Sequence, residues 1–320
     1  MFLKALYLGP LLFLIYINDI VVGMKSDARI FADDTSLFKV VHCPNTAFQD
    51  LNHDLNLIQN WAYQWKMVFN PDPSKPPVEM IFSRKTKPPH HPVLLFNGVP
   101  LERVTEHKHL GVILDIKLKF EKHINEICNK ASKLLGVMKL SRAHVPMSAL
   151  EKVYVAFVRS KLEYGDVLFH TTPSKKKPFR LLPLITDGLP RLMQKLETIQ
   201  YTAARLITGC WKGSSTSKVY NLLGWQYLCQ RRWSNQMSLF HKIIHKKVPT
   251  YLYSLVSIVH SPSNTDILTE TSAKKQFYIK TFFPSCSFSW NSLLKSSERQ
   301  NKSLLSFKSD ILKYSFIQKK

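Results

Sequence analysis

Acidic side chains are scarce in this chain of 320 residues. It contains 22 Asp and Glu against 45 Lys and Arg, which gives a formal net charge of +23 at pH 7. A basic surplus of this size indicates a polyanionic partner, with nucleic acid as the first candidate. The alternative is that the Lys-rich surface only keeps the protein soluble. Residues 171–320 hold 24 basic and 6 acidic residues, so we expect them to provide most of the electrostatic attraction.

Cysteine is also sparse, and its spacing excludes two classes of protein. The five cysteines are odd in number, scattered, and without a Cys-x-x-Cys pair; they are Cys43, Cys128, Cys210, Cys229 and Cys286. This pattern argues against a disulfide framework and against a zinc site. It fits a reducing compartment, so we expect an intracellular location, in the nucleus or the cytoplasm.

No apolar run is long enough to cross a membrane. The longest one near the start, Leu11 to Ile17, ends at Asn18 and Asp19. A membrane-spanning helix needs about 20 apolar residues, so the sequence predicts no membrane partner. We expect this run to form a buried strand or helix instead.

Phe31-Ala32-Asp33-Asp34 is the most informative stretch of the chain. Apolar segments flank it on both sides, which predicts a β-hairpin with the two aspartates at or beside its tight turn. Adjacent carboxylates repel each other, and a divalent cation such as Mg²⁺ removes that cost because it prefers carboxylate oxygen. The alternative for so short a motif is a solvated Asp-Asp turn.

Several further motifs surround this stretch in a fixed order. They are Leu8-Gly9-Pro10 with Asn18-Asp19, the segment Trp65 to Asn70, Met80 to Ser83, and Lys108-His109-Leu110-Gly111. The set resembles the reverse transcriptase of non-LTR (LINE-like, jockey-type) retrotransposons over residues 8 to about 170. The tail is also similar to the region after the polymerase in that family, through Ala203 to Gly209, Leu223-Gly224-Trp225 and Leu239 to His245.

The resemblance implies roles for individual positions. Asp33 and Asp34 match the metal-binding pair of the polymerase palm, which implies Mg²⁺ as the cofactor. The positions that match nucleotide- or primer-binding segments are Gly9, Pro10, Lys75, His109, Leu110 and Gly111. The family adds deoxynucleotides to a DNA primer on an RNA template, so both nucleic acids are implied partners.

The chain also departs from the family pattern. Phe2 to Tyr7 replaces a Gln-Gly-Ser-type sequence, and the family's first catalytic aspartate and fingers lie upstream of that point. The resemblance therefore implies a 5′-truncated copy, in which metal binds weakly and catalysis by this chain alone is negligible. The alternatives are a non-catalytic nucleic-acid-binding protein and a functionless remnant of an element.

We predict an α+β fold in four regions. Residues 1–115 form a partial palm, an antiparallel sheet with helices, and residues 116–170 form thumb-like helices. The thumb-like pair also fits a helical hairpin that only covers the sheet. Residues 171–190, rich in Pro and Lys, form a linker, and residues 191–320 form a basic, mostly helical region.

Individual elements follow from hydrophobic periodicity and turn chemistry. Helices are predicted at 44–68, 120–140, 147–163, 192–207 and 231–245, and short ones at 290–294 and 304–314. Strands are predicted at 78–83, 93–96, 99–104, 108–115 and 276–283. Asn97-Gly98 should join the second and third of these strands, because Asn-Gly is a strong hairpin turn signal.

Basic residues interleaved with aromatic ones in the tail suit phosphate contact combined with base stacking. An amphipathic helical bundle would show the same pattern. The sequence-independent nucleic-acid contacts are assigned to Lys175, Lys176, Lys177, Arg231 and Arg232. The sequence predicts no particular oligomeric state.

Overall fold

The computed structural model divides the chain into two compact units, Met1–Leu118 and Lys119–Lys320. The structure describes residues 2–69, 76–83, 85, 91–169, 191–256, 258–259, 267–268, 281–294, 296–299 and 303–315.

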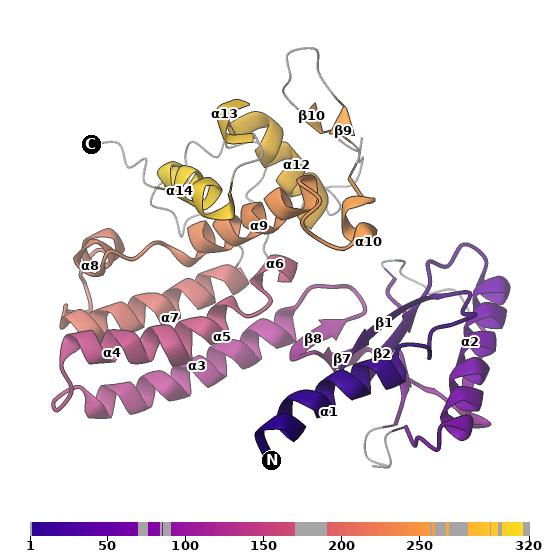
Figure 1. The fold of residues 1–320 in the computed structure, drawn as a ribbon. Coiled ribbons are helices and arrows are strands. Elements are labelled where there is room, and N and C mark those ends of the chain that lie inside the picture. The colour runs from indigo at the N-terminus through magenta and orange to yellow at the C-terminus, as the bar shows by residue number, and fades with distance from the viewer. Residues whose placement is uncertain are drawn as a thin grey trace. The chain divides into compact units, whose positions relative to one another are not determined.

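The first unit combines two long helices with short strands (Figure 1). Its elements are α1 (Phe2–Ile17), β1 (Asp27–Phe31), β2 (Asp34–Phe38), α2 (Pro44–Gln64), β3 (Val78–Glu79), β4 (Leu95–Phe96), β5 (Val99–Pro100), β6 (Glu102–Arg103), β7 (Glu106–His109) and β8 (Val112–Asp115). Among the described residues the strands form separate two-stranded sheets: β1–β2, β4–β5 and β7–β8 are antiparallel, and β3–β6 is parallel. This mixture fits the predicted α+β class.

A small apolar core holds the first unit together. Ile17, Ile20 and Ile58 are buried at its centre, and Ile30 of β1 and Leu37 of β2 pack against them. Side chains alternate between the two faces of a strand, so the hairpin buries one face and leaves the other in solvent. The hairpin is therefore fixed by its inner face against α1 and α2.

The strand predictions in this unit are confirmed only in part, and the strand predicted at 99–104 is divided into β5 and β6. Asn97-Gly98 does join two antiparallel strands, and both residues have positive φ, 52° and 74°, as a tight hairpin turn requires. Residues 108–115 are not one strand. They turn at Leu110 and Gly111, with φ of 45° and 81°, to give the β7–β8 hairpin. The predicted strand at 78–83 is limited to β3.

The apolar run from Leu11 to Ile17 forms the second half of a helix, but it is not buried as predicted. Only Ile17 is in the core, whereas Leu11 and Ile15 are 54% and 67% exposed. Pro10 lies inside this helix.

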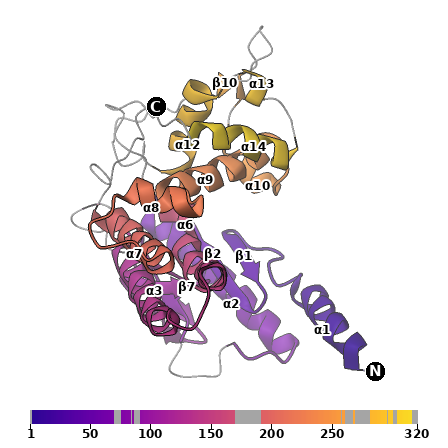
Figure 2. The ribbon, with the colours of Figure 1, turned by 90° about the vertical axis from the view of Figure 1, so that its left-hand side faces the viewer.

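The second unit is almost entirely helical (Figure 2). Its elements are α3 (Glu121–Ser141), α4 (Met147–Val153), the π-helix η1 (Tyr154–Arg159), α5 (Ser160–Glu163), α6 (Asp166–Phe169), α7 (Arg191–Thr208), α8 (Thr216–Leu223), α9 (Leu228–Ile244), α10 (Thr250–Tyr253), β9 (Ile258–Val259), β10 (Ile267–Leu268), α12 (Phe282–Leu293), α13 (Ser296–Arg299) and α14 (Leu304–Ser315). The helix predicted at 147–163 is thus one continuous helical segment with a π-turn at its centre.

The helices predicted as a thumb and the helices of the C-terminal region share a core. The apolar face of α3, which includes Ile124 and Ala131, packs against α7, whose Leu196 and Ala203 are fully buried. Helix α4 also packs on α7. The predicted linker at 171–190 lies outside the described residues.

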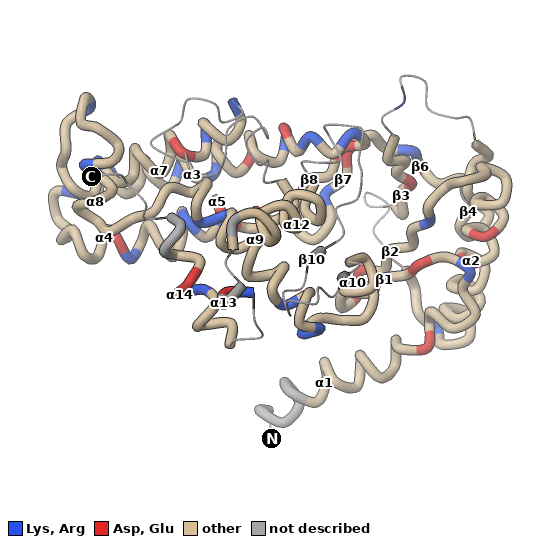
Figure 3. Tube along the Cα trace, turned by 90° about the horizontal axis from the view of Figure 1, so that it is seen from above, with Lys and Arg blue, Asp and Glu red and all other residues tan. Residues whose placement is uncertain are grey.

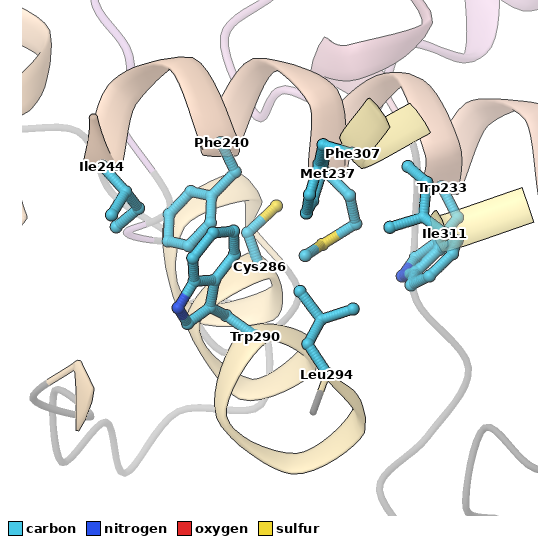
Figure 4. Packing of buried hydrophobic residues seen from close by; sticks show 9 residues of the cluster. All are labelled: Trp233, Met237, Phe240, Ile244, Cys286, Trp290, Leu294, Phe307 and Ile311. Carbon is cyan, nitrogen blue, oxygen red and sulfur yellow. The ribbon is translucent and has the colours of Figure 1, made fainter. Parts of the chain in front are cut away.

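A second cluster forms where α12 and α14 pack on α9 (Figure 4). The buried side chains are Trp233, Met237, Phe240, Ile244, Cys286, Trp290, Leu294, Phe307 and Ile311. Residues Phe282 and Phe283 belong to α12, which corrects the predicted strand at 276–283. The remainder of that strand, 276–280, lies outside the described residues. Aromatic side chains at helical spacing account for this core.

Candidate metal-binding hairpin

The hairpin of β1 and β2 places the two aspartates at its tip. Phe31 pairs with Asp34, so the connection is the two-residue turn Ala32-Asp33. Ala32 has a φ of 52°, in the left-handed region that tight hairpin turns use at their first position. Asp33 and Asp34 are both exposed. The prediction that the pair lies at the turn of a hairpin is confirmed.

The outer face of the hairpin is partly aromatic. Phe31, next to the turn, is 65% exposed, and Phe38 is 45% exposed. The Arg29 guanidinium lies 5.1 Å from the centre of the Phe38 ring, within the range of a cation–π interaction. The tip thus combines two carboxylates with an exposed ring.

Two aspartates of α2 anchor both ends of the hairpin, a role that periodicity did not reveal. Asp54 is fully buried and accepts hydrogen bonds from the backbone N–H groups of Lys25 (2.9 Å) and Ser26 (2.8 Å), just before β1. Asp50, one turn earlier, pairs with the Lys39 ammonium just after β2. Lys39 also donates to the Lys25 carbonyl oxygen at 3.2 Å. The charged residues of α2 therefore fix the position of the catalytic candidate.

The environment of Asp54 favours its charged form. Burial alone would raise the pKa of this carboxyl, but hydrogen bonds from Lys25, His53 and Ser26 outweigh it and lower the pKa below its usual value. The anchor is therefore ionised at neutral pH. Hydrophobic periodicity predicts only the apolar stripe of α2. Asp50 and Asp54 are four residues apart and therefore share one face of the helix, which is a signal for a joint role.

The hairpin fits one side of a divalent-metal site and not a complete one. Asp33 and Asp34 offer the carboxylate oxygens that Mg²⁺ prefers. Within the described part of the chain, however, no group of three or more His, Cys, Asp or Glu side chains is arranged to hold a metal ion. A further ligand is needed before this tip could fix an ion firmly.

The structure places the other positions assigned by resemblance in two locations. Gly9 and Pro10 lie on the exposed part of α1, and a Cβ at Gly9 would meet no atom within 4 Å beyond its chain neighbours and the backbone of its own helix. His109, Leu110 and Gly111 form the turn between β7 and β8. Among the described residues these strands share no sheet with the Asp33–Asp34 hairpin.

Four of the predicted contact residues cannot be placed. Lys75, Lys175, Lys176 and Lys177 lie outside the described residues. Their roles stay predictions.

Arg231 and Arg232 do not form the exposed phosphate-binding pair that the sequence predicted. The Arg231 guanidinium makes a two-point ion pair with the Glu163 carboxylate, one arm of which measures 3.0 Å. Arg232 is fully buried. The neighbouring Glu197 is buried as well, which raises the pKa of its carboxyl to about 6, and the Arg232 charge partly offsets this rise. Both arginines lie on a side of α9 that packs on other helices of its unit, and α9 contacts α6 and α7 among them.

Comparison with curated proteins identifies the relatives of this chain. It is 28% identical over 209 residues to the "Probable RNA-directed DNA polymerase from transposon X-element" of Drosophila melanogaster, covering 63% of this chain and 21% of that protein. It is 23% identical over 258 residues to the "Probable RNA-directed DNA polymerase from transposon BS" of the same organism, covering 75% and 26%. It is 29% identical over 169 residues to the "RNA-directed DNA polymerase from mobile element jockey" of Drosophila funebris, covering 49% and 18%.

The chain is related to the reverse transcriptases of jockey-like non-LTR retrotransposons. The resemblance derived from the sequence motifs is thereby confirmed. The part of the chain that matches spans between 18% and 26% of the length of these three polymerases. No protein-family model matches it, and no solved structure does. Across the described helices, none has the length and apolar character needed to cross a bilayer.

Proposed function

We propose that this chain supplies part of the polymerase of a jockey-like non-LTR retrotransposon. The first unit would be part of the palm, and α3 to α5 would serve as the thumb. The observation that carries the proposal is the exposed Asp33-Asp34 pair at a hairpin turn, in a chain related to RNA-directed DNA polymerases. Its reaction would be template-directed addition of deoxynucleotides to a DNA primer on RNA.

Asp33 and Asp34 would hold Mg²⁺ in this reaction. When bound, a pair of such ions stabilises the attacking and leaving oxygens of a phosphoryl transfer. Two adjacent carboxylates at an exposed tip bind a divalent ion weakly, because the described residues bring no third His, Cys, Asp or Glu side chain to them. We therefore propose that residues 1–320 alone bind metal weakly and do not polymerise.

The second unit would hold nucleic acid through its basic surface. Residues 198–265 contain no Asp or Glu, and their exposed cations are Lys212, Lys218, Lys246 and Lys247. In the helices of the second unit, the blue segments that mark Lys and Arg outnumber the red ones that mark Asp and Glu (Figure 3). Phosphate contacts from such a surface are independent of base sequence.

All five cysteines are free thiols, which supports a reducing compartment, in the nucleus or the cytoplasm.

Primer extension tests the proposal. The purified chain is mixed with a DNA primer annealed to an RNA template, with Mg²⁺ or Mn²⁺. We expect no extension product. Extension that disappears in Asp33→Ala and Asp34→Ala would contradict the expected inactivity and locate the catalytic site at the hairpin.

A second candidate function is non-catalytic binding of nucleic acid, which the incomplete metal site favours. Nucleic-acid affinity that does not change with Mg²⁺, in the wild type and in Asp33→Asn alike, would support this function over the polymerase role.

A further inference from the structure

The loop between α7 and α8 exposes the least buried tryptophan of the chain. Trp211 is 78% exposed, whereas the next most exposed of the six tryptophans, Trp65, is 43% exposed. A single exposed apolar side chain needs no explanation by itself. The surroundings of Trp211 make this one informative.

The loop presents the indole on a fixed base. The Tyr201 hydroxyl, on α7, donates a hydrogen bond to the Ser214 carbonyl oxygen, and the Ser214 N–H donates to the Trp211 carbonyl oxygen at 3.1 Å. The indole lies against Gly213, where an added Cβ would come within 2.7 Å of its Nε1 atom. The glycine therefore allows the ring to rest on the loop, with most of its surface in solvent.

Basic residues lie in this loop and beside it. Lys212 is its neighbour in the loop, and Lys218 is exposed on the first turn of α8. Arg142, at the end of α3, reaches Gly209 so closely that a Cβ there would lie 2.7 Å from its Nη2 atom. In Figure 1 the α3–α4 turn and the α7–α8 loop lie at the same end of the helices.

Acidic residues are missing from both segments that meet here. Residues 127–150 contain four basic residues and no Asp or Glu, and residues 198–230 contain three and none. An exposed aromatic ring set among unopposed cations is the combination that binds single-stranded nucleic acid, because bases stack on the ring while phosphates pair with the cations. A duplex would engage the cations and leave the ring unused, since its bases are already stacked.

We propose that the α7–α8 loop is a single-stranded nucleic-acid site in which Trp211 stacks on an unpaired base, while Lys212, Lys218 and Arg142 contact the adjacent phosphates. The inference rests on the proposed nucleic-acid-binding function and assigns it a location and a strand preference.

The test measures fluorescence anisotropy of the full chain with an oligothymidylate of about 20 nucleotides and with a duplex of similar length. Trp211→Ala should weaken binding to the single strand by roughly 5- to 100-fold, the usual effect of removing one stacked ring. Binding to the duplex should stay unchanged. Trp211→Phe should restore part of the loss, because phenylalanine also stacks.

Leu222→Ala is the matched control, because Leu222 is an exposed apolar residue of α8, 59% exposed. It should leave both affinities unchanged. Replacing Lys212 and Lys218 together with Ala should flatten the slope of log affinity for the single strand against log salt by about 1.4, which is about 0.7 for each lost phosphate contact.

Two results would overturn the inference while leaving the proposed function intact. One is that Trp211→Ala binds the single strand as tightly as the wild type does. The other is an equal loss for single strand and duplex in Trp211→Ala. A wild-type chain that binds neither nucleic acid would overturn the proposed function as well as this site.

Discussion

Replacing Asp54 with Ala should loosen the hairpin that carries Asp33 and Asp34. The buried carboxylate accepts backbone hydrogen bonds from Lys25 and Ser26, and Ala removes both acceptor oxygens. Each hydrogen bond to a charged group contributes about 1.5–3 kcal/mol. Water can reach part of the two donors, so we expect a loss of about 2–4 kcal/mol in the free energy of unfolding of the first unit.

Asp50→Ala and Asp54→Asn are the controls for this prediction. Asp50 pairs with Lys39 nearer the surface, so its removal should cost about 1 kcal/mol or less. Asn at position 54 keeps one acceptor oxygen and should give an intermediate loss. Urea unfolding, with amide hydrogen exchange at Lys25 and Ser26, separates the three variants.

The pH dependence gives this prediction a sign. The folded pKa of Asp54 is lowered, so its stabilising contribution is fully present above the unfolded value of 3.8 and is lost as pH falls through the folded value. Asp54→Ala should therefore differ from the wild type at neutral pH and converge with it in strong acid. Equal losses for Asp54→Ala and Asp50→Ala, with unchanged exchange at Lys25, would refute the anchoring role.

Two further predictions concern the second unit. Trp290→Ala should lower the free energy of unfolding by about 3–5 kcal/mol, because Trp290 is fully buried among aromatic rings; a loss under about 1 kcal/mol in urea unfolding would contradict the packing. His241 is buried against Phe307, and burial, with smaller effects from His245 and Lys247, lowers its pKa from 6.5 to about 4. Between pH 6.5 and 4 the unfolded chain therefore binds a proton at this position that the folded chain does not bind. The free energy of unfolding of the wild type should fall by about 3 kcal/mol relative to that of His241→Phe over this range. Parallel pH profiles of the two proteins would contradict this.

Local patterns predicted the elements that local chemistry decides. The flanking apolar alternation predicted the β1–β2 hairpin, and Asn97-Gly98 predicted the β4–β5 turn. The helices of the second unit followed from their apolar spacing. Periodicity extended one strand over 108–115 and missed the turn at Leu110 and Gly111, where the resemblance to a primer grip implied a turn between strands.

Contacts between distant residues explain what the sequence could not predict. Arg231 appeared to be a surface cation, but its partner Glu163 lies 68 residues earlier in the chain. The apolar stripe of its helix says nothing about Asp54, and the amides from which it accepts hydrogen bonds lie 28 and 29 residues away. Burial of a charged group depends on such partners, and composition contains no information on them.

We propose that Asp33 and Asp34 form a divalent-cation site at the hairpin tip. Paramagnetic broadening of amide signals by Mn²⁺ tests it most directly. The signals of residues 31–34 should broaden first, and Asp33→Asn with Asp34→Asn should abolish the effect. Asp27→Asn, which replaces an exposed aspartate at the other end of β1, should leave it unchanged. Broadening elsewhere in the chain, with the hairpin signals unaffected, would contradict the claim.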